Sequence, residues 1–284
     1  MKSASHSRTT WRTASNGENL AENFLSHNDL IDHIAQLADA VQLTSFSSQP
    51  PWCLYEGVTC GDVAGIASYG MIQSISLTNL GLTGTLPDSI GDFRSLTLFD
   101  ISSNNIHGNI PDTVINWRAG ITSLSLNSNN LTGTIPPAIG HLTSLAALHL
   151  HDNNLEGSIP SAIGNLNSLL ILTLDGNSLT GEIPSTIGGM AAMQHISMNS
   201  NMLEDTIPSG ISALSRQVYV DVANNHLSTG SAGTLSDIIF SDATKSGTLK
   251  LSVNRLAYLS DADPEQNFVA TGCFPAAAEA TGEF

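Results

Sequence analysis

Basic residues are scarce in this chain of 284 residues, which has nine Lys and Arg against 25 Asp and Glu and a formal net charge of −16. Residues 13–93 and residues 119–215 contain no Lys or Arg at all. Binding to nucleic acid phosphates or to an anionic membrane surface depends on these side chains, so neither is expected as a partner. A cationic or an uncharged polar partner fits the charge better. Negative charge that serves only solubility is the alternative.

Cysteines and long apolar runs are also few. The cysteines are Cys53, Cys60 and Cys273, and no stretch is apolar enough to span a membrane. The first 16 residues are basic and rich in Ser and Thr but have no apolar segment, so no secretory signal is visible. Such a start is typical of a transit peptide or of a disordered tail. The chain also lacks a P-loop, a GxSxG sequence, an HExxH sequence and a CxxC pair, so we expect neither an enzyme nor a cofactor.

One asparagine recurs at nearly constant spacing. Successive members are 25, 24, 24, 24 and 24 residues apart up to Asn225, and Leu80 holds the equivalent position one period before the first. A last member follows after a gap of 29 residues. The series is Asn104, Asn129, Asn153, Asn177, Asn201, Asn225 and Asn254. A fixed period in this range predicts a solenoid, because a single repeat cannot bury its apolar face without neighbours.

Apolar and polar residues alternate just before each asparagine. Leu148 and Leu150, for example, stand five and three positions before Asn153. This alternation predicts a short strand with one buried face, and stacked copies of it predict a parallel sheet. A buried carboxamide can both donate to and accept from backbone groups, so we expect the asparagines to form a structural ladder between repeats.

A second pattern follows each asparagine. A glycine comes four positions later in several repeats, and an Ile-Pro or Leu-Pro step follows it, as Gly157 and Ile159–Pro160 illustrate. Glycine permits a turn at positive φ, and proline is disfavoured inside a strand or helix. Each strand is therefore expected to end in a turn, with another layer of inward apolar residues beyond it.

Residues 145–168, LAALHLHDNNLEGSIPSAIGNLNS, resemble the plant-type leucine-rich repeat LxxLxLxxNxLxGxIPxxIGxL, and the resemblance extends over roughly residues 70–256. It implies an α/β solenoid, a right-handed leucine-rich-repeat superhelix with a concave parallel sheet. Similar proteins are the ectodomains of receptor-like kinases and the polygalacturonase-inhibiting proteins. The latter have more cysteines at both ends than this chain has.

The resemblance also implies caps at the two ends of the stack. Residues 51–60, PWCLYEGVTC, are similar to a family cap closed by a disulfide, which here would join Cys53 to Cys60. Apolar residues at helical spacing within 24–41 predict a covering helix. We divide the chain into a tail (1–18), an N-terminal cap (19–70), about eight repeats (71–256) and a C-terminal cap or tail (257–284). Cys273 is either a free thiol or lacks its partner.

The outward strand positions predict the binding surface. Most are small polar residues, and they suit hydrogen bonding to an extended peptide or to a glycan. The expected partner-binding residues of the concave face are Asp100, Asn127, His149, His151, Asp175, Asn199 and Asp221. We expect Asp175 to neighbour His151, so this group could bind a partner, respond to pH or hold a divalent metal, or it could have no specific role.

The predicted function is therefore non-catalytic binding of a protein or peptide, with a cationic partner or a glycan as further candidates. The alternatives are a scaffold subunit of a larger complex, such as a plastid one, and an inhibitor of a cell-wall glycosidase. A cap disulfide favours an extracytoplasmic compartment, whereas the basic start leaves an organelle as the alternative.

Overall fold

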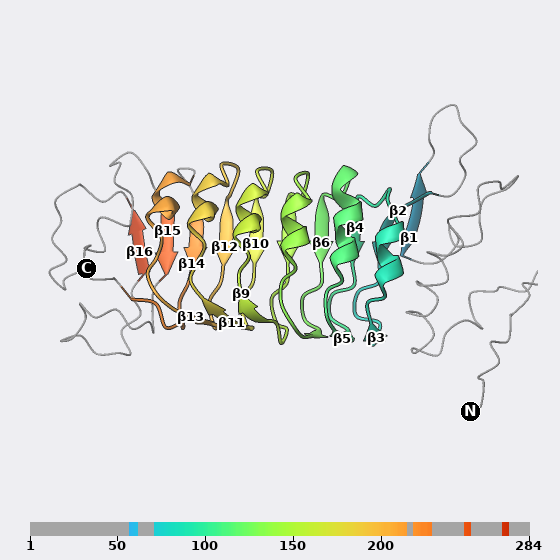
Figure 1. The fold of residues 1–284 in the computed structure, drawn as a ribbon, viewed down its shortest axis with the longest axis horizontal. Coiled ribbons are helices and arrows are strands. Elements are labelled where there is room, and N and C mark those ends of the chain that lie inside the picture. The colour runs from blue at the N-terminus through green and yellow to red at the C-terminus, as the bar shows by residue number, and fades with distance from the viewer. Residues whose placement is uncertain (1–56, 62–70, 215–217, 229–246, 251–268, 273–284) are drawn as a thin grey trace, which may run out of the picture.

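The computed structural model describes residues 57–61, 71–214, 218–228, 247–250 and 269–272. Its main element is a 10-stranded sheet with the order β1-β2-β4-β6-β8-β10-β12-β14-β15-β16. All strands between the two ends run parallel to their neighbours (Figure 1). They are β2 (Met71–Ser76), β4 (Leu98–Asp100), β6 (Ser123–Ser125), β8 (Ala147–His149), β10 (Ile171–Thr173), β12 (His195–Ser197), β14 (Tyr219–Asp221) and β15 (Gly247–Lys250).

The register of this sheet follows the sequence period. Leu148 of β8 is paired with Leu124 of β6 on one side and with Leu172 of β10 on the other. All three side chains are completely buried. The predicted strands, their inward faces and the solenoid architecture are thus confirmed.

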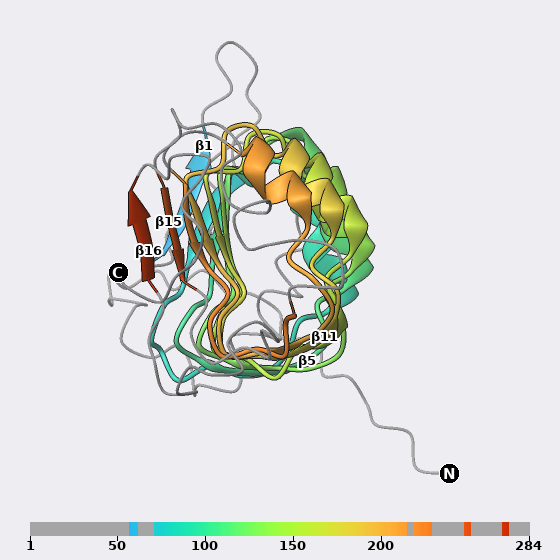
Figure 2. The same cartoon turned by 90° about the vertical axis from the view of Figure 1, so that its left-hand side faces the viewer.

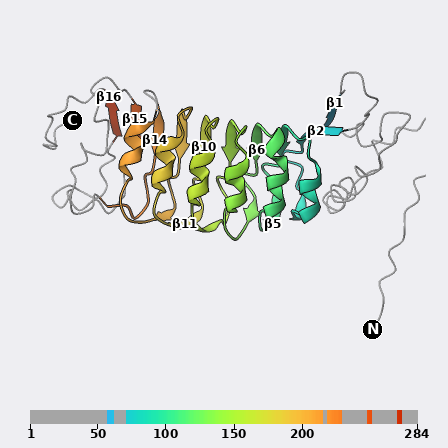
Figure 3. The ribbon, with the colours of Figure 1, turned by 45° about the horizontal axis from the view of Figure 1, so that its top comes forward.

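The opposite side of the solenoid is a row of short 3-10 helices, which Figure 3 shows side by side along the molecule. Each helix begins directly after the proline of the Ile-Pro or Leu-Pro step. That proline is the N-cap residue and has an extended backbone conformation. The helices are η3 (Asp88–Asp92), η4 (Asp112–Ala119), η5 (Pro137–His141), η6 (Ser161–Asn165), η7 (Ser185–Gly189) and η8 (Ser209–Ala213).

The glycine of the Ile-Gly pair explains how closely these helices stack. A Cβ atom on Gly164 would lie 2.4 Å from the backbone oxygen of Thr186 in the next repeat, a distance that no side chain tolerates. The longer helix η4 has Ile115 at the equivalent position and holds Trp117 inside the core. The indole Nε1 of Trp117 donates to Ile90 O at 3.0 Å, and its ring contacts Phe99.

Smaller strands connect the two sides. They form two 3-stranded sheets, which we call the lateral strip, and Figure 2 shows this strip between the main sheet and the 3-10 helices. The first sheet contains β3 (Thr83–Thr85), β5 (Asn105–Gly108) and β7 (Asn130–Leu131). The second contains β9 (Glu156–Ser158), β11 (Ser178–Gly181) and β13 (Met202–Leu203).

The periodic asparagines bond each repeat to the one before it. Asn153 Oδ1 accepts from the Leu131 N–H at 3.0 Å, and its Nδ2 donates to the backbone oxygens of Leu126, Leu150 and His151. The other described asparagines of the series repeat this pattern. Leu80 differs, because its side chain is 45% exposed and does not enter the ladder.

A left-handed residue precedes each position of this ladder. Asp152, directly before Asn153, has φ of 52°, and Gly176 has φ of 64° one repeat later. The equivalent residues of the other described repeats are Asn79, Ser103, Ser128, Ser200 and Asn224, all at positive φ. This conformation is costly for most L-residues; Gly, Asn and Asp tolerate it, and Ser adopts it here in three repeats. It turns the chain so that the following asparagine points inward.

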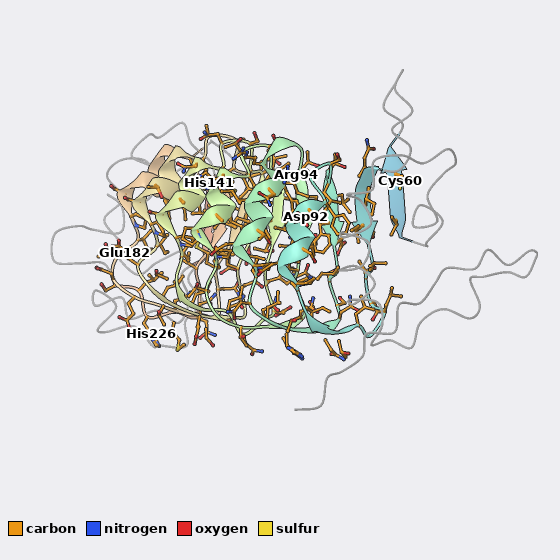
Figure 4. All side chains as sticks on the ribbon, turned by 45° about the vertical axis from the view of Figure 1, so that its right-hand side comes forward. Cys60, Asp92, Arg94, His141, Glu182 and His226 are labelled. Atoms are coloured by element: carbon orange, nitrogen blue, oxygen red, sulfur yellow. The ribbon has the colours of Figure 1, made fainter. Side chains whose placement is uncertain are left out.

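An antiparallel strand closes each end of the sheet. β1 (Val58–Gly61) pairs with β2, and β16 (Val269–Gly272) pairs with β15. Cys60 lies on β1, half-buried at the end of the core (Figure 4). Cys53, Cys273, Asn254 and the predicted helix within 24–41 lie outside the described residues, so the cap disulfide and the domain boundaries remain predictions.

Candidate functional site

The outer surface of the main sheet, which we call the strand face, carries all seven predicted binding residues. Side chains of a strand point alternately to its two faces, so the residues next to the buried ones point outward. The seven predicted residues are half-buried, in keeping with side chains that stand on a sheet and reach solvent. They are Asp100, Asn127, His149, His151, Asp175, Asn199 and Asp221.

A histidine pair lies at the centre of this face. His149 is the last residue of β8 and His151 follows two positions later, so both point to the same side. Their ring centroids are 6.1 Å apart and the rings are nearly perpendicular, at 86°. Both Nδ1 atoms approach the hydroxyl of Thr173 on β10, which lies 3.0 Å from His149 Nδ1 and 2.8 Å from His151 Nδ1.

The hydroxyl replaces the contact that the sequence predicted for His151. Asp175 is in the repeat next to His151, as expected, and Asp152 N donates to Asp175 O at 2.9 Å. No ion pair between His151 and Asp175 is found in the part of the chain that the structure describes. The ring of His151 is oriented by Thr173 instead, because the hydroxyl lies between the two imidazoles.

The pKa of His149 is lowered from its ordinary value, mainly because burial disfavours the charged imidazolium. The positive charges of His151 and His195 act in the same direction, whereas Asp100 and Asp175 favour the charged form. The geometry therefore favours a neutral His149.

A second aromatic group lies further along the face, towards the C-terminal end. The rings of His195 on β12 and Tyr219 on β14 stack at 4.7 Å with an interplanar angle of 8°. The Tyr219 hydroxyl donates to Asp221 Oδ2 at 3.0 Å, and Ala223 N donates to Asp221 Oδ1 at 3.1 Å. This carboxylate is thus held in one orientation.

The other predicted residues are dispersed along the sheet. Asp100 lies on β4, two strands from β8, and its Oδ1 accepts from Ser102 N at 2.9 Å. Asn127 and Asn199 flank the histidine pair on either side along the solenoid, and Asn199 Oδ1 accepts from the Ser197 hydroxyl at 2.7 Å. The structure therefore brings together His149, His151 and Asp175, and places Asp100 and Asp221 towards the two ends.

Two residues of this surface, Thr173 and Tyr219, were not among the predicted binding residues, although Thr173 falls in an outward column of the sequence. Thr173 is only 9% exposed, so its role as the shared partner of the histidines depends on packing between repeats. Tyr219 stands six positions before Asn225, one step back along the same alternation that gave the predicted residues. Extending that alternation would have identified the outward column that contains Ile171, His195 and Tyr219.

The chemistry of the site is that of hydrogen bonding. Within the described residues no group of three or more His, Cys, Asp or Glu side chains is arranged to hold a metal ion. In the same part of the chain, no helix is both long and apolar enough to cross a membrane.

Comparison with known proteins identifies the repeats. A family model described as leucine rich repeat matches residues 119–179, and a second model with the same description matches residues 95–117. The chain is 40% identical over 99 residues to the LRR receptor-like serine/threonine-protein kinase GSO2 of Arabidopsis thaliana. That match covers 35% of this chain and 7% of the kinase.

Two solved structures show where the resemblance lies. The plant peptide hormone receptor RGFR1, solved in complex with RGF2, has a TM-score of 0.56 and 33% identity, covering 62% of this chain and 27% of the receptor chain. A plant ice-binding protein has a TM-score of 0.64 and 26% identity, covering 81% of this chain and 73% of its own.

The chain is therefore a plant-type leucine-rich-repeat protein, and it resembles the ectodomains of plant receptor kinases. It spans well under two thirds of the length of the kinase and of the receptor that it matches.

Proposed function

We propose that the protein binds a peptide or an extended segment of another protein along its strand face. The observation that carries this proposal is the pair His149 and His151, which is half-buried and is oriented by hydrogen bonds to the Thr173 hydroxyl. Asp175 is half-buried in the next repeat. The resemblance to a peptide hormone receptor ectodomain supports the same function. A module of this kind binds without catalysis, because an open sheet surface excludes little water from a reacting group.

The charge of the strand face supports a cationic partner. From β4 to β14 its outward positions include the carboxylates of Asp100, Asp175 and Asp221 and no Lys or Arg. Lys250 on the next strand, β15, is paired in register with Asp221. The described arginine side chains, Arg94 and Arg118, are exposed on the side of the 3-10 helices, where Figure 4 shows Arg94. Association with a basic peptide would therefore be faster at low ionic strength.

We further propose an extracytoplasmic location, because the similar solved structures include the LRR ectodomain of a plant membrane receptor kinase from Arabidopsis thaliana. A scaffold subunit in an organelle and an inhibitor of a cell-wall glycosidase stay as alternatives. A scaffold would dock through its ends or its 3-10 helices, so it would be insensitive to changes on the strand face.

The test uses a double variant of the strand face. A partner would be captured from native extract with the full chain, identified by mass spectrometry and then titrated by calorimetry. His151→Ala with Asp175→Ala should weaken binding at least tenfold while the unfolding midpoint changes little, because both side chains are outward. The matched control is His141→Ala on η5, on the opposite side of the solenoid (Figure 4). Equal binding by the double variant, with loss in the control, would refute the strand-face proposal.

Ice binding is a second candidate, favoured by the plant ice-binding protein and by the lateral strip. Asn130, Thr132 and Thr134 are exposed at alternate positions in β7 and just beyond it, so they offer three small polar groups within one repeat. Glu156, Glu182 and Glu204 interrupt the same rows in later repeats, which makes this function the weaker one. Inhibition of ice recrystallisation that survives the strand-face variant and is lost with Thr132→Glu would support it.

A further inference from the structure

The two central histidines share one hydroxyl, which restricts how their protons can be placed. A hydroxyl carries one hydrogen and two lone pairs. The Thr173 side chain is nearly buried, and within the described residues its only side-chain hydrogen bonds are those to His149 Nδ1 and His151 Nδ1. Because buried polar groups are usually satisfied, the hydroxyl hydrogen points at one of these two nitrogens. That nitrogen must then be unprotonated.

The other imidazole completes the arrangement by donating its Nδ1–H to the same oxygen. A neutral imidazole has a single N–H, so the two rings must be opposite tautomers. One ring is left with Nε2 as an acceptor, and the other is left with Nε2–H as a donor. This conclusion holds whichever ring takes which role.

Both Nε2 atoms are available to a ligand. Neither has a hydrogen-bond partner in the described part of the chain. In that same part, the single fully buried side-chain nitrogen or oxygen without a partner is Thr113 Oγ1, far from this face on η4. The Nε2 atoms of His149 and His151 are therefore not fully buried.

We propose that His149, Thr173 and His151 form an amide-recognition site, in which one Nε2 accepts from an N–H of the ligand and the other Nε2–H donates to a C=O. The proposal rests on the proposed function, since a bound peptide would supply the amide. Two sources offer an N–H and a C=O on the same side. One is a single residue of an extended main chain, and the other is the side-chain carboxamide of Asn or Gln.

Acid would abolish this recognition. A proton on the ring with the acceptor Nε2 converts this nitrogen directly into a second donor. A proton on the other ring makes its Nδ1 a donor to the hydroxyl oxygen, so the hydroxyl must donate to Nδ1 of the first ring, whose own proton then moves to Nε2. In both cases no Nε2 acceptor is left for the ligand N–H. The charged or titratable groups that face His149 are Asp100 on β4, Asp175 after β10, His195 on β12 and His151 itself. Burial and the two histidines favour the neutral form that recognition needs, and the carboxylates oppose it.

The first arm of the test needs no partner. Long-range proton–nitrogen NMR spectra of the full chain at about pH 8, above the ordinary histidine pKa, report the tautomer of each ring. We expect opposite tautomers for His149 and His151 in the wild type and in Thr173→Ser, which keeps the hydroxyl. Thr173→Val, which keeps the shape, should abolish the strict pairing. Identical tautomers in the wild type would overturn the proposal.

The second arm uses three small probes. Acetamide represents the carboxamide, N-acetylglycine N-methylamide represents the main chain, and N,N-dimethylacetamide lacks an N–H. At least one of the first two should shift both Nε2 resonances, and the one that does so identifies the source. The affinity should fall at least tenfold in Thr173→Val and be retained in Thr173→Ser. No shift with either amide, or an equal shift with dimethylacetamide, would overturn the proposal.

The two proposals fail separately. Loss of peptide binding in general would be seen by calorimetry with the captured partner, whereas the tautomers and the small amides are measured on the protein alone.

Discussion

Replacing one asparagine of the ladder tests whether the carboxamides hold the repeats together. Asn153→Leu is the sharpest change, because leucine is similar in size and apolar, and the residue lies in the middle of the stack. Leu131 N–H donates to Asn153 Oδ1 at 3.0 Å in a fully buried position. The variant would leave that donor without a partner.

The expected magnitude follows from which groups lose their only partner. Leu126 O and Leu150 O each keep a bond from a neighbouring asparagine, and His151 O keeps one from Ser128 N. One orphaned buried donor costs about 1–3 kcal/mol, and the weakened carbonyls raise the total to about 2–4 kcal/mol. For 284 residues, an unfolding entropy of about 2.1 cal/mol/K per residue converts that into a thermal midpoint lower by roughly 3–7 °C.

The effect should be measured both at the Leu131 amide and on the unfolding of the whole chain. Stability in a solenoid is close to a sum over repeats, so unfolding need not be all-or-none. Hydrogen exchange at the Leu131 amide would report the lost bond directly, next to thermal unfolding by circular dichroism. The matched control is Asn154→Leu, one residue further and exposed. If Asn153→Leu keeps both the midpoint and the protection of Leu131, the ladder does not stabilise the stack as argued.

Two further predictions concern a titrating group and the cap. Because the pKa of His149 is lowered in the folded state, the unfolded chain takes up the proton first as pH falls through the ordinary value of 6.5, so stability should be lost below that pH. Urea unfolding of His149→Gln should show a shallower pH dependence, and an unchanged slope, matching that of His141→Gln, would contradict the assignment. If Cys53 pairs with Cys60, thiol counting on unfolded, unreduced protein should find one free thiol, and three would rule out the pairing.

The sequence was sufficient for those features that recur in every repeat. The inward positions of Leu148 and Leu150, the asparagine ladder and the turn glycines each appear several times in one register, so chance is excluded as their cause. The secondary structure of the segments opposite the main sheet could not be predicted from the sequence. A five-residue stretch such as Ser161–Asn165 has no periodicity that distinguishes a 3-10 helix from a turn.

Contacts between different repeats could not be predicted in the same way. Thr173 and His151 are 22 residues apart, and their hydrogen bond depends on the rotamers of both side chains. The alternation of residues does not predict that two histidines share one hydroxyl. Ser125 and Ser197 occupy the same column as Thr173, and no histidine is hydrogen-bonded to either of them in the described part of the chain. The stack of His195 on Tyr219 has the same origin, because it needs the register of β12 and β14.

The difference between positions that fix the fold and positions that face solvent indicates which part of the strand face would recognise a ligand. Inward positions hold apolar residues in every described repeat and ladder positions hold asparagine from Asn104 on, so the outward columns are free to vary without altering the fold. In the first three repeats those columns contain mostly Ser and Thr, whereas the imidazoles and the phenol lie from β8 to β14. The imidazole and phenol side chains are therefore confined to one half of the described strand face. A ligand would make its selective contacts there, while the hydroxyl-rich half would contribute contacts that many chains could satisfy.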